Sequence, residues 1–382
     1  MIKNYDVVII GGGPAGTALG FLLQNAGISN CIVDKQLFPR NKLCGGLLTE
    51  KTLSLLHEIY KTNEFPYERT TSAVSLFIGK HKLSTVVTNS NFCLVNRKEF
   101  DNYLLEQYKI SGGIVYEGRK IEKIDEDNKL LSLDNNTNLI YNVLVGADGA
   151  NSQVRQLIDS TYHPNAFCIE ANYPSEFVNN YIEVYFATIR NGYGWCFPKN
   201  KYYTVGIGGS IKKNKNIKEL FMTFSKDIGK SVSNDQIKGA MIPFGKYVKK
   251  PCKGNILLIG DAAGLVDPIT GEGIYFALKS SVCAYNSIYK YFYNNLSLQK
   301  CYHKALKDIH LIINNANCFK KVFFNEFMQT IFLKKIEGRT HITKYFCENI
   351  LANYNTLYMQ FPFKYAIIRY KRKLKDKISI KN

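Results

Sequence analysis

The residues with the clearest chemical meaning are three glycines near the N-terminus. Gly11, Gly13 and Gly16 follow the apolar run Val7-Val8-Ile9-Ile10 in the spacing Gly-x-Gly-x-x-Gly. This spacing provides a tight turn, a close backbone approach to a pyrophosphate, and close packing of a helix on a strand. Asp34 ends the next apolar run, near the spacing expected for a carboxylate on a ribose hydroxyl. The stretch predicts a dinucleotide site; the alternative is an ordinary strand–helix–strand unit without a ligand.

A second candidate is the stretch Phe38-Pro39-Arg40-Asn41-Lys42-Leu43-Cys44-Gly45-Gly46. Two glycines behind a proline and two cations predict a loop whose backbone approaches a ligand closely. The ten cysteines of the chain include no Cys-x-x-Cys pair, so neither a metal site nor a disulfide framework is expected. Most of them we expect to be buried and inert, and Cys44 is the one we single out.

Acidic residues follow two later apolar runs. Gly146-Ala147-Asp148-Gly149 comes after the run that ends at Val145, and Gly260-Asp261 after the run that ends at Ile259. A carboxylate at the end of a strand, such as Asp261, can accept hydrogen bonds from ligand hydroxyl groups. Gly264 and Gly273 allow the backbone to approach closely.

Tyr193, Trp195 and Phe197 alternate along one segment, so their side chains share one face of an extended strand. This face suits a bulky apolar ligand, but the same periodicity fits a sheet face packed into the core. Pro198 and the later glycines favour the edge of a cavity over a central strand.

The surrounding pattern predicts the elements that position these residues. We expect buried strands at 5–10, 31–34, 114–116, 129–133, 139–145 and 255–259, and helices at 17–25, through 100–108, and after 274. A different region has antiparallel strand patterns within 74–88, at 181–186 and at 203–207, and a helix at 217–228.

These elements predict an α/β fold: a Rossmann-like domain, an inserted antiparallel-sheet substrate domain and a helical C-terminal region. The dinucleotide-binding domain takes residues 1–73, 89–165 and 244–295. The substrate domain takes 74–88 and 166–243, and the helical, basic and aromatic region takes 296–382.

Composition limits the function classes. The chain has 382 residues, 46% of them hydrophobic, and no apolar run near the ~18 residues of a membrane span. No secretory leader is visible, so we expect a cytoplasmic location, with the inner face of the membrane as a further one. We also expect a monomer. The net charge is +19, and residues 318–382 carry 14 Lys and Arg against 4 Asp and Glu. This charge suits an anionic membrane or a solvated basic surface; no nucleic-acid-binding module accompanies it.

The three glycine and acid clusters, in this order, resemble the flavoprotein class that includes aromatic hydroxylases. The resemblance implies FAD, with its ADP half on the first glycine motif and its pyrophosphate and ribityl end near Asp148 and Asp261. Arg97, in Arg-x-x-Phe-Asp, resembles an arginine that this class uses near the cofactor; the alternative is a surface cation at a helix start. The residues that the resemblance assigns to FAD are Gly11, Gly13, Ala15, Gly16, Asp34, Arg40, Cys44, Gly45, Arg97, Ile121, Asp148, Gly149, Asp261, Gly264, Gly273 and Ile274.

Within this class the chain resembles the geranylgeranyl reductase family. Tyr193-Gly194-Trp195-Cys196-Phe197-Pro198 followed by Gly206-Ile207-Gly208, the Pro39 to Gly46 stretch, and Gly260 to Ile274 each resemble a family signature. These matches lie within residues 6–276. The resemblance implies reduction of C=C bonds in a prenyl (geranylgeranyl-type) lipid, with Tyr193, Trp195 and Phe197 near the substrate.

The resemblance places Cys44 beside the flavin, as a proton donor, a packing residue or a thiol that contacts substrate. Because no second Gly-x-Gly-x-x-Gly occurs, transient NAD(P)H or a ferredoxin-type protein is the expected electron donor. The alternative function is a flavin-dependent monooxygenase or halogenase acting on a hydrophobic or aromatic small molecule. A third possibility is a flavin-binding peripheral membrane protein without catalytic activity.

Overall fold

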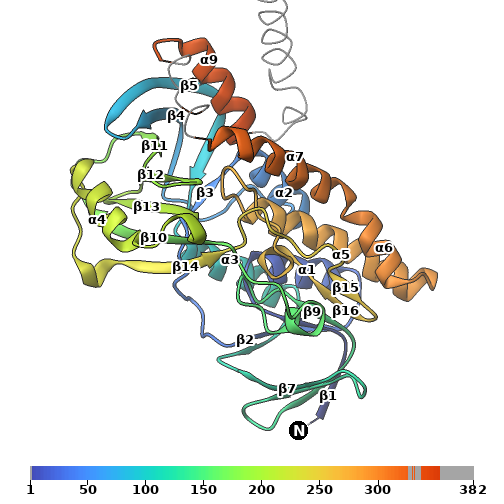
Figure 1. Ribbon diagram of the computed structural model, residues 1–382. Coiled ribbons are helices and arrows are strands. Elements are labelled where there is room, and N and C mark those ends of the chain that lie inside the picture. The colour runs from blue at the N-terminus through green and yellow to red at the C-terminus, as the bar shows by residue number, and fades with distance from the viewer. Residues whose placement is uncertain (1, 326–328, 330, 332–336, 353–382) are drawn as a thin grey trace, which may run out of the picture.

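The computed structural model describes residues 2–325, 329, 331 and 337–352. Two sheets and the helices around them make up this part of the chain (Figure 1). The basic C-terminal stretch beyond residue 360 lies outside the described residues.

The first sheet has the strand of the glycine motif near its centre. The strand order is β15-β16-β9-β1-β2-β6, and β8 and β7 continue antiparallel from β9. β1 pairs in parallel with both β9 and β2, and residues 7–10 are at most 5% exposed. Burial on both faces explains the unbroken apolar run. The strands are β1 (Ile2–Ile10), β2 (Asn30–Asp34), β6 (Ile114–Glu117), β7 (Ile121–Asp125), β8 (Leu130–Leu133), β9 (Asn138–Gly146), β15 (Cys252–Lys253) and β16 (Ile256–Leu258).

Helix α1 (Pro14–Asn25) follows the glycine motif and contacts α3 (Arg97–Ile110) and α5 (Ile274–Asn294) (Figure 1). The Ser281 hydroxyl of α5 donates a hydrogen bond to the Ala15 carbonyl at 2.7 Å. The neighbouring Ser280 hydroxyl accepts one from the Gly260 N–H at 2.9 Å. One helix therefore holds both the glycine turn and the segment that contains Asp261.

The second sheet has the order β14-β10-β13-β12-β11-β4-β5-β3. Its neighbouring strands are antiparallel except β11 and β4, which are parallel. With the first sheet and the helices that follow it, this arrangement confirms the predicted fold class. The strands are β3 (Leu47–Leu48), β4 (Arg69–Ile78), β5 (His81–Leu94), β10 (Ala166–Pro174), β11 (Tyr181–Phe186), β12 (Gly192–Pro198), β13 (Tyr202–Ser210) and β14 (Lys238–Ile242).

Two features of the second sheet differ from the expectation. β12 pairs with β11 and β13, so the aromatic segment is a central strand, although Pro198 and the later glycines favoured the edge of a cavity over a central strand. Pro198 is the last residue of β12, where its missing N–H interrupts little of the ladder. The strand pair expected within 74–88 extends over 69–94. The expected pair was too short because a register shift between Thr71 and Ala73 interrupts the alternating pattern of the sequence there.

The remaining helices include α7 (Lys307–Phe323), which contributes to two hydrophobic cores. Ile309 and Ile313 pack into the core of the first sheet, and Phe319 and Phe323 pack into the core of the second. No helix within the described ranges is long and apolar enough to cross a membrane. The others are α2 (Glu50–Tyr60), α4 (Ile217–Asp227), α6 (Leu298–Ala305), α9 (Thr340–Phe346), and the short helices η1 (Val154–Leu157), η2 (Ile211–Lys213), η3 (Asn234–Gln236), η4 (Gly260–Ala263) and η5 (Cys347–Ala352).

Arg155 joins the segment after β9 to η4, a role that no sequence motif indicated. Its guanidinium donates to the Ala262 carbonyl at 3.0 Å and to the Ala150 carbonyl at 2.6 Å, and it stacks 4.5 Å from the centre of the Tyr162 ring. The side chain is 1% exposed, and this burial lowers the pKa of Arg155. Arg155 thus fixes the spacing between two segments that carry predicted site residues.

We predict that Arg155→Met destabilises the fold by about 2 kcal/mol or more. The substitution leaves two buried carbonyl groups without a donor, and such groups cost about 1–3 kcal/mol each. Urea unfolding should show a lower midpoint with an unchanged slope. Arg119→Met removes an exposed cation of the same domain and serves as the control. Equal midpoints for the two variants would contradict the assigned role.

Candidate functional site

The glycine turn between β1 and α1 is built for close backbone contact. Gly11 has φ +109°, and a Cβ there would lie 2.3 Å from the Ala147 carbonyl oxygen. A Cβ on Gly16 would lie 1.9 Å from the Gly11 carbonyl oxygen. For Gly13 the nearest atom is Nη2 of Arg40, 3.4 Å away, so this glycine faces a cation rather than packed backbone. A helix N-terminus beside a guanidinium fits a pyrophosphate.

Asp34 lies at the carboxyl end of β2, beside the glycine turn. Its Oδ2 accepts a hydrogen bond from the Gly12 N–H at 2.8 Å, and its Oδ1 accepts one from the Gln36 N–H at 2.9 Å. The two bonds fix the carboxylate at the end of the strand next to the glycine motif. In dinucleotide-binding folds an acidic residue here binds the ribose, so the geometry fits the prediction.

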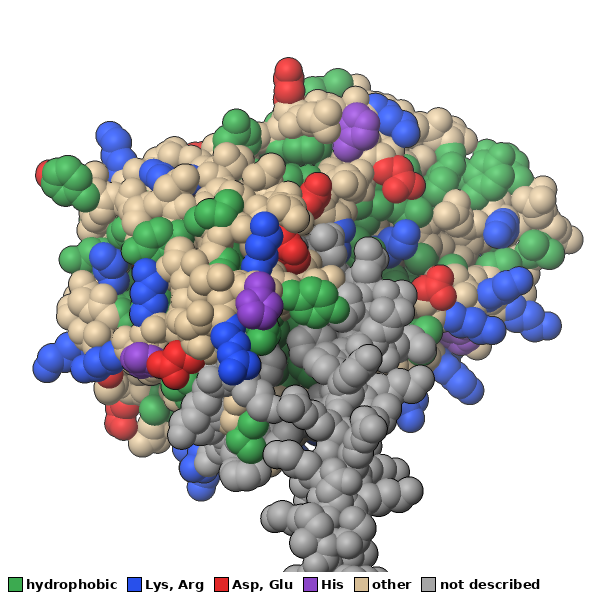
Figure 2. Space-filling model, turned by 90° about the horizontal axis from the view of Figure 1, so that it is seen from above, with side chains coloured by type: hydrophobic (Ala, Val, Ile, Leu, Met, Phe, Trp, Pro, Cys, Tyr) green, Lys and Arg blue, Asp and Glu red, His purple; other side chains and the backbone are tan. Residues whose placement is uncertain are grey.

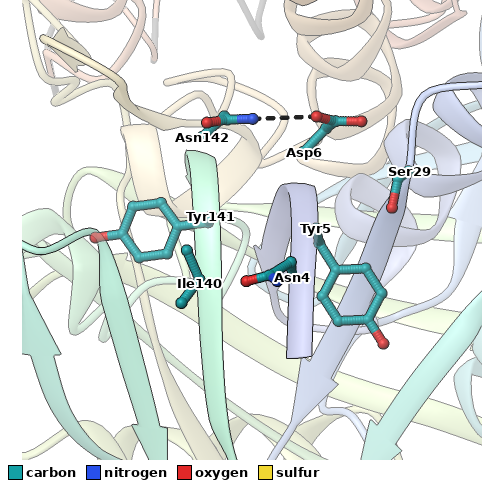
Figure 3. A pocket seen from close by; sticks show the side chains of 7 residues that line it. All are labelled: Asn4, Tyr5, Asp6, Ser29, Ile140, Tyr141 and Asn142. Atoms are coloured by element: carbon teal, nitrogen blue, oxygen red, sulfur yellow. Dashed lines mark hydrogen bonds between the residues drawn. The ribbon is translucent and has the colours of Figure 1, made fainter. Parts of the chain in front are cut away.

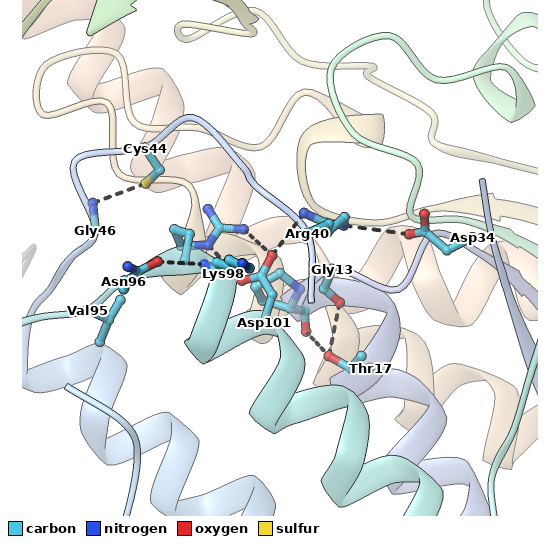
Figure 4. Close-up of polar contacts among 12 residues, drawn as sticks. Gly13, Thr17, Asp34, Arg40, Cys44, Gly46, Val95, Asn96, Lys98 and Asp101 are labelled. Atoms are coloured by element: carbon cyan, nitrogen blue, oxygen red, sulfur yellow. Dashed lines mark hydrogen bonds and ion pairs between the residues drawn. The ribbon is translucent and has the colours of Figure 1, made fainter. Parts of the chain in front are cut away.

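Arg40 lies between two carboxylates (Figure 4). It is 3.3 Å from Oδ2 of Asp101 and 4.0 Å from Oδ2 of Asp34. Asp101 also accepts two hydrogen bonds from Arg97, at 2.7 and 2.8 Å. Arg97 is therefore a buried, paired residue, and the surface-cation alternative is wrong. Burial alone would lower the pKa of Arg97, but the Asp101 carboxylate and the Cys44 thiol beside it raise it.

Two further carboxyl groups lie where the first sheet's strands end. Oδ2 of Asp148 accepts from the Gln153 N–H at 2.6 Å, whereas its Oδ1 is enclosed and has no hydrogen-bond partner within the described chain. Asp261 lies in η4, with Oδ1 3.2 Å from where a Cβ on Gly273 would be. Burial raises the pKa of both carboxyl groups. An enclosed carboxylate oxygen without a donor favours a ligand that brings hydroxyl groups.

Backbone conformation and local packing describe the other residues assigned to the cofactor. Gly149 has φ +79° and open space where a side chain would be, and Gly264 has φ +77°. A Cβ on Gly264 would lie 2.5 Å from the Lys246 carbonyl oxygen. Close packing against the protein's own backbone therefore requires glycine at this position. Ile274 begins α5 and packs into a core, and Ile121 begins β7, opposite Leu133.

The cysteine loop (residues 38–46) lies against the aromatic row, which we define as Tyr193, Trp195 and Phe197. A Cβ on Gly45 would lie 2.8 Å from the Phe197 ring and 3.4 Å from Nε1 of Trp195. Ring centres are 5.9 Å apart for Tyr193 and Trp195 and 6.4 Å for Trp195 and Phe197. The Tyr193 hydroxyl donates to the Thr270 carbonyl. The aromatic row therefore lies between the cysteine loop and the loop that precedes α5.

Cys44 is held by groups that sequence reasoning missed. Its Sγ accepts from the Gly46 N–H at 3.4 Å (Figure 4), and its own N–H donates to Oε1 of Glu170 at 2.8 Å. Lys199 is 2% exposed and donates to the Val95 carbonyl at 2.7 Å; burial lowers the pKa of Lys199 to about 8. Neither Glu170 nor Lys199 belongs to a motif. The available signal was a single carboxyl residue in the apolar run 166–171.

An open pocket of about 370 Å³ lies elsewhere on the first sheet (Figure 3). It is at the amino-terminal part of β1, whereas the glycine turn follows the carboxyl end of the same strand. At ~3.3 Å per residue the two are roughly 20 Å apart. The pocket therefore plays no part in the site described above. It is lined by Asn4, Tyr5, Asp6, Ser29, Ile140, Tyr141 and Asn142.

Comparison with known proteins relates the chain to proteins with an FAD-binding domain. Residues 4–289 match the model of a family described as FAD binding domain. An uncharacterized protein of Methanosarcina barkeri is 32% identical over 321 residues, which cover 80% of this chain and 81% of that protein. A geranylgeranyl diphosphate reductase of Rhodobacter capsulatus is 27% identical over 291 residues, or 72% of each chain.

Solved structures share the fold. A geranylgeranyl bacteriochlorophyll reductase-like protein of Thermoplasma acidophilum superimposes with a TM-score of 0.80 at 18% identity, over 95% of this chain and 98% of that one. A probable FAD-dependent monooxygenase of Pseudomonas aeruginosa superimposes with a TM-score of 0.70 at 16% identity, over 87% and 99%. At these identities the likeness concerns the fold alone.

We predict that the purified protein is yellow and releases flavin on denaturation. Asp34→Ala should raise the Kd for FAD about 10- to 150-fold, since a hydrogen bond to a charged group contributes about 1.5–3 kcal/mol. Titrating deflavinated protein with FAD and following flavin fluorescence measures this. Glu122→Ala, an exposed carboxylate of β7, is the control. Colourless protein that takes up no FAD on reconstitution would disprove the cofactor assignment.

Proposed function

The chain belongs to the FAD-binding-domain family, with geranylgeranyl reductases among its relatives, and on this premise we propose that it reduces C=C bonds of a prenyl-type lipid. The observation that carries the proposal is the contact between the cysteine loop and the aromatic row. This contact brings the loop that carries the Cys44 thiol onto a row of apolar rings, next to residues that fit FAD.

Reduction of an unactivated alkene needs a hydride at one carbon and a proton at the other. Bound FAD, once reduced, supplies the hydride. The chain's residues bind and orient: the N-terminus of α1 and Arg40 fit the pyrophosphate, and Asp34 fits the ribose. Asp148 and Asp261 offer carboxylate oxygens to the ribityl hydroxyls.

The aromatic row supplies an apolar wall for the prenyl chain. Trp195 and Phe197 belong to the same hydrophobic cluster as Phe319 and Phe323 of α7. Packed rings hold little water, which protects the reduced cofactor from side reactions. The loop that carries Cys44 packs on this wall through Gly45, and the Cys44 thiol lies beside the Arg97 guanidinium.

The electron donor in this proposal is transient NAD(P)H or a ferredoxin-type protein. Only one Gly-x-Gly-x-x-Gly motif occurs in the sequence, and FAD accounts for it. A donor that docks, transfers electrons and leaves needs no second dinucleotide-binding turn.

The second candidate function is that of a flavin-dependent monooxygenase or halogenase. It is supported by the fold shared with the probable monooxygenase of Pseudomonas aeruginosa. The two functions differ in their use of O₂. Substrate-dependent O₂ consumption favours the oxygenase, and saturation of a prenyl chain under anaerobic conditions favours the reductase.

We predict that Cys44→Ser keeps FAD but loses about 10²- to 10⁴-fold in alkene-reducing turnover, the range typical of a general acid. Anaerobic incubation with a geranylgeranyl lipid and a chemical reductant, followed by mass spectrometry of the lipid, measures the saturated product. Cys301→Ser on α6 removes a thiol far along the chain and is the matched control. Unchanged turnover in Cys44→Ser would leave Cys44 as a packing residue.

We further propose that the protein collects its substrate at an anionic membrane surface. A prenyl lipid is poorly soluble, and residues 318–382 carry a net charge of +10 from 14 basic and 4 acidic residues. Lys and Arg side chains also outnumber acidic ones on the face shown in Figure 2. Cations near an anionic surface contribute about 1 kcal/mol each, and aromatic residues can sit at the interface. The tail residues concerned, all outside the described part, are Phe361, Phe363, Lys364, Arg369, Lys371, Arg372, Lys373, Lys375 and Lys377.

Vesicle co-sedimentation tests this attachment. The full chain should sediment with anionic vesicles and be released at high salt, because salt screens the attraction. Removing residues 369–382 should abolish sedimentation and leave the flavin bound. A Lys212→Ser, Lys213→Ser double variant removes two exposed cations elsewhere and should behave as the full chain does. If the truncated protein still sediments, the tail is a solvated surface and not the anchor.

A further inference from the structure

The cysteine loop is held in place by a carboxyl group that no motif contains. Oε1 of Glu170, on β10, accepts the Cys44 N–H at 2.8 Å. Its other oxygen, Oε2, is enclosed and has no hydrogen-bond partner within the described residues. An enclosed carboxylate oxygen without a donor is costly, and protonation lowers the cost because a neutral group is buried in place of a charge. The geometry of Glu170 thus favours a carboxyl group that carries a proton beside Cys44.

The same carboxyl group shares a sheet face with the aromatic row. Glu170 lies opposite Gly206, and Gly206 lies opposite Trp195, so the three residues form a line across β10, β13 and β12. Residues directly opposite each other point to the same face. A Cβ on Gly206 would lie 2.2 Å from the indole, which shows that Trp195 extends over this strand. Nε1 of Trp195 also lacks a hydrogen-bond partner in the described structure.

The charges around Glu170 come from several elements. Burial raises the pKa of Glu170 to about 7, against the opposing effect of the Cys44 N–H and of three cations. The cations are Lys199, Arg97 and Lys238, and Cys168 lies on the same strand. The Glu170 carboxyl group therefore holds its proton below about pH 7 and loses it as the pH rises through that value.

We propose that Glu170 stores the proton that Cys44 delivers to the substrate, so that the two groups form a proton relay. The inference rests on the proposed alkene reduction. The Cys44 S–H bond breaks as a C–H bond forms at one alkene carbon, while the other carbon receives the hydride from reduced FAD. The Cys44 thiolate then takes the proton of the Glu170 carboxyl group, and Glu170 regains a proton from solvent. In sum the alkene gains one hydride and one proton, and a cofactor bound in its reduced form would give up the two electrons.

The first test needs no substrate. Infrared difference spectra of the FAD-bound protein should contain the C=O stretch of a protonated carboxyl group that disappears as the pH rises through about 7. Glu170→Gln should lack this band, and it keeps an acceptor for the Cys44 N–H. Glu183→Gln removes a buried carboxyl group on the other face of the same sheet and should keep the band. A titrating band that persists in Glu170→Gln, or no such band in the wild type, would overturn the proposal.

The second test follows the thiol itself. The rate of Cys44 alkylation is measured for the peptide that contains it, over a range of pH. This rate should change in a step near pH 7, where Glu170 ionises. In Glu170→Gln the step should vanish, because the group that ionises near pH 7 is gone. Bound flavin absorbance and the melting temperature establish that the variant is folded. A pH profile identical to that of the wild type would mean that the carboxyl group does not act on Cys44.

The third test joins the relay to turnover. Wild-type alkene reduction should fall as the pH rises through about 7, and Glu170→Gln should be slow without this dependence. If the wild type reduces no prenyl lipid while the infrared and alkylation results hold, the proposed substrate class fails and the coupling of Glu170 to Cys44 stands. If turnover of Glu170→Gln keeps the wild-type rate and pH profile, the relay fails and the reductase function stands.

Discussion

The contact on which the rest of the structure depends is that of backbone against backbone at the glycine turn. Gly11 lies so close to Ala147 that no side chain fits between them, and the Ala147 N–H donates to the Ile10 carbonyl at 2.7 Å. This contact brings the ends of β1 and β9 together. Arg155 and the serines of α5 then hold η4 against the same point. Three segments distant in sequence therefore converge at the carboxyl end of one sheet, where α/β folds bind ligands.

The cysteine loop makes contacts with residues of both sheets. On one side Arg40 forms ion pairs with Asp34 and Asp101, which belong to the dinucleotide half of the molecule. On the other side Gly45 packs on the aromatic row, and the backbone N–H of Cys44 donates a hydrogen bond to Glu170 of the second sheet. A thiol in this loop is thus placed by both halves at once. Contacts from both halves therefore hold a short loop that belongs to no helix or strand.

Sequence patterns predicted what depends on short-range rules. The glycine spacing, the buried strand 7–10 and the long helix after Ile274 follow from local periodicity and turn chemistry, and all three are present. The central position of β12 was not predictable, because strand order is set by partners far away in the sequence. Glu170 was missed for the same reason: its significance comes from the Cys44 N–H, 126 positions away. Helix α2 was not predicted, although the helical spacing of Leu55, Leu56 and Ile59 indicates it.

Helix α7 has a mechanical consequence. Because its first half is embedded in one core and its second half in the other, neither core can rotate away from the other without pulling apolar side chains into water. Because α7 belongs to both cores, the two sheets and their cores should unfold as one cooperative unit instead of separately. A hinge that opens the whole molecule is therefore disfavoured.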